Sequence, residues 1–338
     1  GMKRRRQHED GQWKVYFPRW PKTQDGAYWY KTDTSSDELD GHYFFYPIYY
    51  DLVAETPEEK EQVREIVRNL TDHLIRNEFC LVDHDGTPTR WGYYSPSVLN
   101  QDFNWYVERG LKSLSILSYL TVAQHITGDA AYGRVIDELI QKHYYAINAM
   151  VTKMQRGFGS GNQSDDEMAV MCYFNLVRYT PDEHLRKQFL LSFYQYWLLL
   201  RREMNPFFHT CYAVCGLNQE YQDSWGTYDL SPWPGWLEDS AATLTGFPLD
   251  RVDWRHTNSH RLDLILLPLD SEIELDQRTL RKRGYKVNGK VLPVQERHFN
   301  HYNHDPWAFD TGGNGHGLAS VTVYLLPYYM GLYYGFIE

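Results

Sequence analysis

The chain has 338 residues, with 44 acidic and 34 basic side chains and a formal net charge of -10. This acidic balance argues against a general nucleic-acid binder, because such proteins usually carry a basic patch or stripe. A chain of this length buries enough surface to fold without disulfides or metal ions. Its four cysteines show no zinc-ligand spacing. We therefore interpret them as free thiols and predict no metal and no other cofactor.

The apolar segments are too short for a membrane span, which needs about 18 consecutive apolar residues. The basic start of the chain, from Met2 to Arg6, is followed by no apolar stretch and does not resemble a signal peptide. A leader ahead of this start would change that interpretation, so the compartment stays undecided between cytoplasm and periplasm.

A helix-start signal occurs twice and predicts a repeated helical hairpin. Residues 35–38 and 164–167 both follow the pattern Ser-x-Asp-Glu of a capping box, in which serine and glutamate bind the free amides of a helix start. An apolar, aromatic stretch follows each box. Each stretch ends at a second box with proline at the first helical position, at 56–59 and 180–183. The pattern indicates an antiparallel hairpin used as a repeating unit.

Further elements follow from local patterns. A stripe of leucines from Leu111 predicts a helix up to Ile126, and Thr127-Gly128-Asp129 separates it from a second helical stretch, 130–150. Residues 285–292 predict a small β-hairpin around Asn288-Gly289. An apolar tail, 318–337, contains Pro327 and predicts a kinked or split final helix.

Helical hairpins with one apolar face must stack to bury it. Six hairpins of about 50 residues would nearly fill the chain, which favours a closed ring over an open solenoid. The predicted fold is therefore all-α: an (α/α)6 toroid of antiparallel helical hairpins with a small β-hairpin insertion. We expect residues 1–30 to form an N-terminal extension and residues 31–338 to form a single toroid domain.

Three segments carry a resemblance to a known superfamily. Residues 33–44 resemble the first hairpin of six-hairpin, (α/α)6-toroid proteins of bacterial polysaccharide metabolism. Residues 162–168, Asn-Gln-Ser-Asp-Asp-Glu-Met, resemble the Asp-Asp helix start of hydrolases in that superfamily, including unsaturated-glucuronyl hydrolases. Residues 126–132 are similar to the inter-helix turn of such toroids. The resemblance implies hydrolysis of a glycosidic bond in an oligosaccharide, with uronate-containing substrates included, and a general acid/base role for Asp165 or Asp166.

The carboxylates at the two helix starts are the candidate catalytic residues: Asp37, Asp40, Asp165 and Asp166. An acid in the first turn of a helix can simply complement the helix dipole. However, helix starts in a ring of hairpins gather at one end, and two convergent carboxyl groups are what glycoside hydrolysis requires. A general acid there needs burial or a neighbouring like charge to keep its proton near neutral pH.

The aromatic content of 16 % is high, and loop aromatics are suited to stacking on sugar faces. Arginine can clamp a carboxylate, although a helix-surface ion pair is an alternative role. The candidate substrate-binding residues are Trp29, Trp91, Trp105, Arg109, Trp225, Trp233, Asn258, His260, Arg261, His304 and His316.

Two alternatives stay open. One is a polysaccharide lyase that uses His260 or His304 with Tyr302 and Arg261, as lyases on related toroids use His, Tyr and Arg. The other is a non-catalytic, carbohydrate-binding toroid whose acids only cap helices. A metal site at residues 298, 301 and 304, all His, is disfavoured because the segment resembles a loop. The predicted ligand is an oligosaccharide or polysaccharide in all of the favoured cases, with no nucleic-acid partner.

Overall fold

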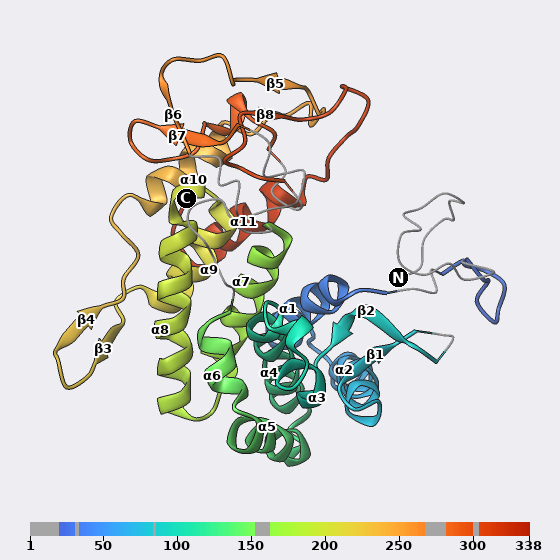
Figure 1. Cartoon of the computed structure of the whole chain (residues 1–338). Coiled ribbons are helices and arrows are strands. Elements are labelled where there is room, and N and C mark those ends of the chain that lie inside the picture. Colours follow the sequence, from blue (N-terminus) through green and yellow to red (C-terminus); the bar gives the residue numbers. More distant parts are fainter. Residues whose placement is uncertain (1–19, 31–33, 84–85, 153–162, 268–281, 300–303) are drawn as a thin grey trace. The chain divides into compact units, whose positions relative to one another are not determined.

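The computed structural model describes residues 20–30, 34–83, 86–152, 163–267, 282–299 and 304–338. The chain divides into two compact units, Gly1–Lys153 and Met154–Glu338. Helices account for most of the regular structure, and the strands form small two-stranded antiparallel sheets (Figure 1). The expected mainly helical class is therefore confirmed, and the closed ring stays a prediction.

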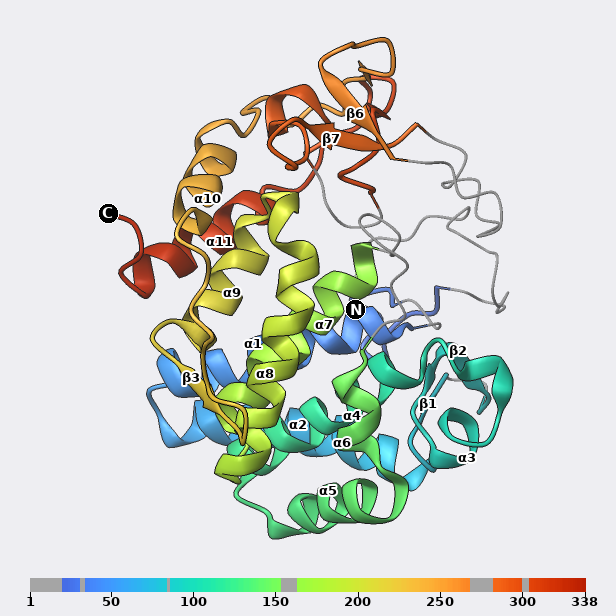
Figure 2. The ribbon, with the colours of Figure 1, turned by 60° about the vertical axis from the view of Figure 1, so that its left-hand side comes forward.

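Helix α4 is the centre of the first unit. Its sequence is apolar or small almost all round, so nearly every residue from Gly110 to Ala123 is buried. The other helices of this unit pack around α4 (Figure 2). The elements of the unit are α1 (Ser36–Leu52), α2 (Pro57–Arg76), β1 (Cys80–Val82), β2 (Pro88–Tyr93), α3 (Pro96–Leu99), η1 (Phe103–Trp105), α4 (Arg109–Thr127), α5 (Ala130–His143) and α6 (Tyr145–Met150).

The predicted helix starts of the first unit are confirmed. The Glu38 carboxylate accepts the Ser35 amide at 3.2 Å, which anchors the start of α1. At α2 the Thr56 hydroxyl accepts the Glu59 amide at 3.2 Å, and the Glu59 carboxylate accepts the Thr56 amide at 3.0 Å. The predicted helical stretch 130–150 is interrupted, because Tyr144 adopts a φ of 61° and separates α5 from α6.

Helix α9 has the central position in the second unit and contacts α7, α8, α10 and α11. Stacked rings fill the space between α7, α8 and α9. The Tyr173 and Phe193 ring centroids lie 5.1 Å apart, and those of Trp197 and Tyr212 lie 4.6 Å apart. The helical elements are α7 (Gln163–Tyr179), α8 (Glu183–Leu200), η2 (Arg201–Glu203), α9 (Pro206–Gly216), α10 (Trp236–Thr245), η4 (Val294–Glu296) and α11 (Thr322–Tyr333).

Both capping boxes predicted for the second unit are wrong. Helix α7 begins at Gln163, so Ser164 lies inside the helix and not at its cap. Helix α8 begins at Glu183, and the Asp182 carboxylate, not the Thr180 hydroxyl, accepts the Leu185 amide at 2.7 Å. Asp182 replaces Thr180 because aspartate is at least as good a cap and lies closer to the helix.

Short strands connect the irregular parts of the second unit. They are β3 (Glu220–Gln222) with β4 (Thr227–Asp229), β5 (His256–Thr257) with β8 (Asp310–Thr311), and β6 (Leu264–Leu266) with β7 (Gly284–Lys286). The predicted turn at Gly289 forms, with a φ of 78° and a 2.7 Å bond from its amide to the Lys286 carbonyl. The Lys286 amide also donates to the Lys290 carbonyl across the turn at 2.9 Å. However, β7 pairs with β6, and residues 290–292 form no strand.

The last helix, α11, contains Pro327 as predicted, but it covers only the middle of the segment 318–337. No helix of the described residues is both long enough and apolar enough to cross a membrane.

Candidate active site

The buried carboxylate of Asp166 is the centre of the candidate site. Asp166 lies in the first turn of α7 and is only 1 % exposed. The hydroxyl of Tyr196, a buried residue of α8, donates to Asp166 Oδ1 at 2.5 Å. Asp165, the other candidate of the pair, is only partly buried. The structure thus selects Asp166 as the inward-facing carboxylate, a choice that the sequence left open.

Glu203 brings a second carboxyl group into the same electrostatic neighbourhood. It lies in η2, between the end of α8 and the start of α9, where Asn205 caps the next helix with a 2.9 Å bond to the Phe207 amide. Glu203 is 2 % exposed, and its Oε1 accepts the indole N–H of Trp307 at 3.0 Å. Its Oε2 has no hydrogen-bond partner among the described residues. A buried carboxyl oxygen without a partner is costly unless the group is neutral or a ligand completes it.

Burial and like charge keep protons on two carboxyl groups beside Asp166. Burial, with the charge of Asp166 as the second cause, raises the pKa of Glu203 to about 8. The same two causes raise the pKa of Glu167 to about 8. The raised pKa values favour the protonated form of both groups near neutral pH, which is the form that a general acid requires.

A buried arginine supports the backbone around Glu203. Arg297 is 1 % exposed, and its guanidinium donates to the carbonyl of Leu292 at 2.9 Å and to that of Glu203 at 3.3 Å. Burial lowers the pKa of Arg297 to about 10, so the group stays charged at neutral pH. Its charge lowers the pKa of Glu203 less than burial and the Asp166 charge raise it.

The first unit holds the other two candidate carboxylates. Asp40 is 1 % exposed, and its Oδ1 accepts the Tyr119 hydroxyl at 2.6 Å. The buried ammonium of Lys112 lies in the same cluster and donates to Ser36 Oγ at 2.7 Å. Asp37 is partly exposed and accepts the Ser35 hydroxyl, so it acts within the helix cap. Asp37 and Asp166 belong to different units, and their convergence at one rim stays a prediction.

The candidate aromatic residues occupy separate places. In the first unit Trp91 and Trp105 pack edge to face with ring centroids 6.5 Å apart, and the Lys22 ammonium lies 5.1 Å from the Trp29 ring. Arg109 is the partly buried first residue of α4. In the second unit Trp225 is 88 % exposed between β3 and β4.

Trp233, also in the second unit, is partly buried, with the Lys290 ammonium 4.6 Å from its ring.

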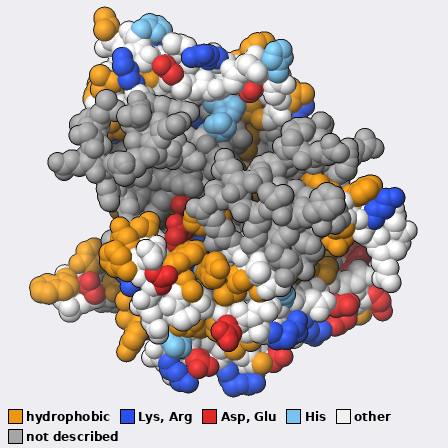
Figure 3. Space-filling model, turned by 45° about the vertical axis from the view of Figure 1, so that its right-hand side comes forward, with side chains coloured by type: hydrophobic (Ala, Val, Ile, Leu, Met, Phe, Trp, Pro, Cys, Tyr) orange, Lys and Arg blue, Asp and Glu red, His pale blue; other side chains and the backbone are white. Residues whose placement is uncertain are grey.

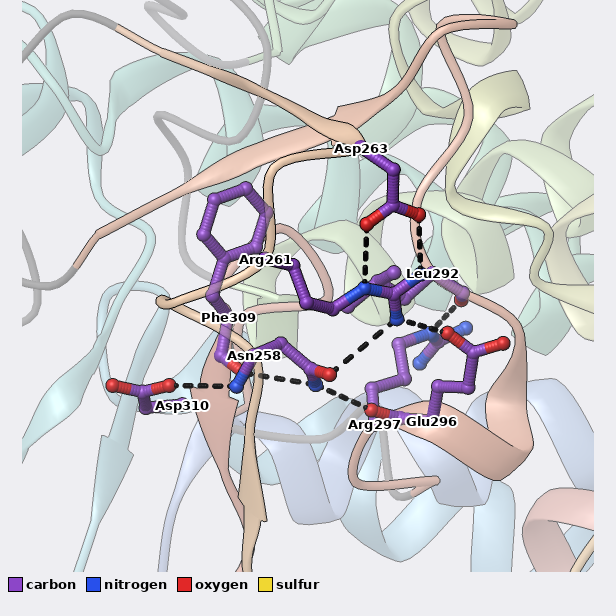
Figure 4. Close-up of polar contacts among 8 residues, drawn as sticks. All are labelled: Asn258, Arg261, Asp263, Leu292, Glu296, Arg297, Phe309 and Asp310. Atoms are coloured by element: carbon purple, nitrogen blue, oxygen red, sulfur yellow. Dashed lines mark hydrogen bonds and ion pairs between the residues drawn. The ribbon is translucent and has the colours of Figure 1, made fainter.

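The polar residues around Asn258 and Arg261 connect neighbouring loops by hydrogen bonds and ion pairs (Figure 4). The Arg261 guanidinium forms two bonds to Asp263, at 2.9 and 2.6 Å, and pairs with Glu296. The Asn258 amide donates to the carbonyl of Glu296 at 2.7 Å and to that of Phe309 at 3.2 Å. Arg261 is thus already neutralised by carboxylates of its own chain, which weakens the lyase alternative.

The histidine candidates do not form a metal centre in the described part of the chain. His298 and His304 have ring centroids 4.2 Å apart, and burial followed by the charge of His304 lowers the pKa of His298 to about 4. No group of three or more His, Cys, Asp or Glu side chains in the described ranges has metal-site geometry. His301 and Tyr302 lie outside the described residues.

His260 and His316 are exposed, and histidine side chains are visible at the surface in Figure 3.

Sequence reasoning selected neither Glu203 nor Glu167 as a candidate site residue. Glu167 was visible only as part of a capping motif. Glu203 had no local signal beyond its place before the Asn-Pro helix start at 205–206. No protein-family model, no curated protein and no solved structure matches the chain, so the assignment of a function depends on the residues themselves.

Proposed function

We propose that the chain hydrolyses a glycosidic bond in an oligosaccharide, uronate-containing substrates included, and that its hairpins form an (α/α)6 toroid. The observation that carries the proposal is the carboxyl cluster of Asp166, Glu167 and Glu203. In this cluster burial and like charge raise the pKa of two acids to about 8. Glycoside hydrolysis needs one protonated and one ionised carboxyl group at the same pH, and environments that separate two pKa values supply both.

Each residue then has a defined role. Glu203 donates its proton to the leaving glycosidic oxygen, since its Oε2 has no partner among the described side chains. Asp166 is the ionised partner that activates water or stabilises the positive charge that develops on the sugar ring. The Tyr196 hydroxyl fixes the orientation of that carboxylate through its 2.5 Å bond. Glu167 keeps a second proton in the cluster. This assignment moves the acid from the Asp-Asp motif to Glu203 and leaves Asp166 as its partner.

The test is the release of reducing ends from a panel of neutral and uronate-containing oligosaccharides. Glu203→Gln keeps the shape of the side chain and removes the titrating proton, and Asp166→Asn removes the partner charge. Each variant should lose roughly a hundredfold or more in kcat. The control is Glu238→Gln, an exposed carboxylate on α10, which should retain full activity.

Other outcomes separate the alternatives. Full turnover by both Glu203→Gln and Asp166→Asn would overturn the proposal. A new ultraviolet absorbance of an unsaturated uronate would indicate a lyase instead. Sugar binding without any release of reducing ends would indicate a binding toroid.

A further inference from the structure

A pocket of about 360 Å³ lies in the second unit, and its lining does not include the residues to which we assign catalysis. Its volume is within the range of small-molecule sites. The walls are mainly apolar and include Leu249, Val294 and Phe299, and the Trp254 indole is 54 % exposed. Asp250 is the charged side chain of the lining. The pocket therefore combines a large aromatic ring with one negative charge.

The Trp254 ring is held in a fixed position. Its indole N–H donates to Asp250 Oδ2 at 2.9 Å. The glycine-rich segment 312–317 packs against the other side of the residue. A Cβ on Gly315 would lie 2.7 Å from the indole ring, and one on Gly312 would lie 1.9 Å from the Trp254 carbonyl oxygen. These glycines permit the close approach that orients the ring, which gives the segment a structural role.

The charge of the pocket is negative. Asp250 accepts the Trp254 indole and the Val252 amide, and these bonds hold the pKa of Asp250 below its usual value. Burial lowers the pKa of His256, the lining histidine, so it adds no positive charge at neutral pH. The Arg251 guanidinium donates to the Ala319 carbonyl at 3.2 Å and is not part of the lining.

We propose that this pocket binds a small organic cation, with the cation against the Trp254 ring and beside the Asp250 carboxylate. A tryptophan face is the best aromatic partner for a cation, and a neighbouring carboxylate adds attraction that a neutral ligand of equal shape does not receive. The site is separate from Asp166 and Glu203, so the proposal does not depend on the proposed hydrolase activity.

The experiment compares choline with 3,3-dimethylbutan-1-ol, its neutral isostere, by titration calorimetry on the full chain. Choline should bind about tenfold more tightly than the isostere, a difference of about 1.4 kcal/mol. Trp254→Ala and Asp250→Asn should each weaken choline binding about fivefold or more. Asparagine keeps only one of the two oxygens that accept the Trp254 indole and the Val252 amide, so Asp250→Asn removes the charge together with one of these hydrogen bonds.

Two controls keep the result interpretable. Trp225→Ala removes another exposed tryptophan, outside the pocket, and should leave choline binding unchanged. Trp254→Phe retains a smaller aromatic face if the alanine variant does not fold, and it should bind choline more weakly than the wild type. Equal binding of choline and its isostere, no binding of choline, or unchanged affinity in the Trp254 and Asp250 variants would overturn the proposal.

Discussion

In the described part of each unit a buried aspartate accepts a hydrogen bond from a buried tyrosine. In the first unit Tyr119 donates to Asp40 at 2.6 Å, and in the second Tyr196 donates to Asp166 at 2.5 Å. The surroundings differ in their balance of acidic and basic groups, although the buried guanidinium of Arg297 also lies beside Glu203 in the second unit. The Asp40 cluster contains the buried ammonium of Lys112, whereas Asp166 lies among other carboxyl groups.

The difference shows two ways to bury a carboxylate. In the first unit the buried ammonium of Lys112 donates to Ser36. The Tyr119 hydroxyl links the Ser36 carbonyl to Asp40, so the cation and the carboxylate belong to one hydrogen-bonded network. In the second unit neighbouring acids keep their protons instead, so that the cluster does not accumulate charge. The first arrangement is suited to holding helices together. The second leaves acidic protons available at neutral pH, which is why we place the chemistry there.

The largest expected effect is a pH dependence that comes from the second unit. The pKa of Glu203 is raised from 4.5 to about 8 in the folded state, so the native state binds more protons than the unfolded state between these values. Its stabilising contribution is therefore complete below pH 4.5 and is lost as the pH rises through about 8. The slope reaches at most about 1.4 kcal/mol per pH unit for one group.

Urea unfolding at about pH 5 and about pH 8 measures this slope. Glu203→Gln should flatten it, because glutamine does not titrate, whereas the exposed Glu238→Gln control should leave it as in the wild type. Glu167, whose pKa is also raised, should account for much of the pH dependence of stability that persists in Glu203→Gln. An unchanged slope in Glu203→Gln would mean that Glu203 is not a buried neutral acid, and the contrast between the two units would fail.

The second prediction tests charge compensation in the first unit. Lys112→Met removes the buried ammonium but keeps a long apolar side chain, so Asp40 stays buried without that cation. We expect a loss of about 3 kcal/mol in the free energy of unfolding, measured by urea unfolding at neutral pH. Adding Asp40→Asn to Lys112→Met should recover part of the lost stability, because the buried negative charge of Asp40 is then removed as well. Lys142→Met, which breaks an exposed ion pair with Glu138, is the matched control and should have little effect.

A loss in Lys112→Met that Asp40→Asn does not reduce would contradict the compensation. The lysine would then stabilise the unit through its stem and its bond to Ser36 alone.

What the sequence could predict depends on whether a residue's partners are local or distant in the chain. The start of α2 was predictable because Thr56, Pro57 and Glu59 lie within one turn and the cap is local. Asp166 was also identifiable as a candidate, as one of an Asp pair at a helix start. The choice of Asp166 over Asp165 was not, because Tyr196, which binds it, comes from the next helix, thirty residues along the chain.

Glu203 was even harder to predict from the sequence. Its indole partner, Trp307, lies 104 residues away in sequence, and its raised pKa depends on burial that no local pattern reports. The starts of α1 and α2 follow from local chemistry. The protonation state of a carboxyl group follows from the packing of distant segments, and the candidate site depends on that packing.

The smallest expected effect compares two threonines to which the sequence assigned the same role. Thr56 caps α2 through its hydroxyl, whereas the Thr180 hydroxyl is buried with no partner among the described residues. Thr56→Val should therefore lower the free energy of unfolding by about 1 kcal/mol. Thr180→Val, of nearly the same shape, should be neutral or slightly stabilising, because it removes a buried hydroxyl that makes no hydrogen bond. Thermal or urea unfolding of both variants measures the difference. Equal losses would mean that Thr180 caps α8 after all, and that Asp182, which accepts the Leu185 amide, is not the sole cap of that helix.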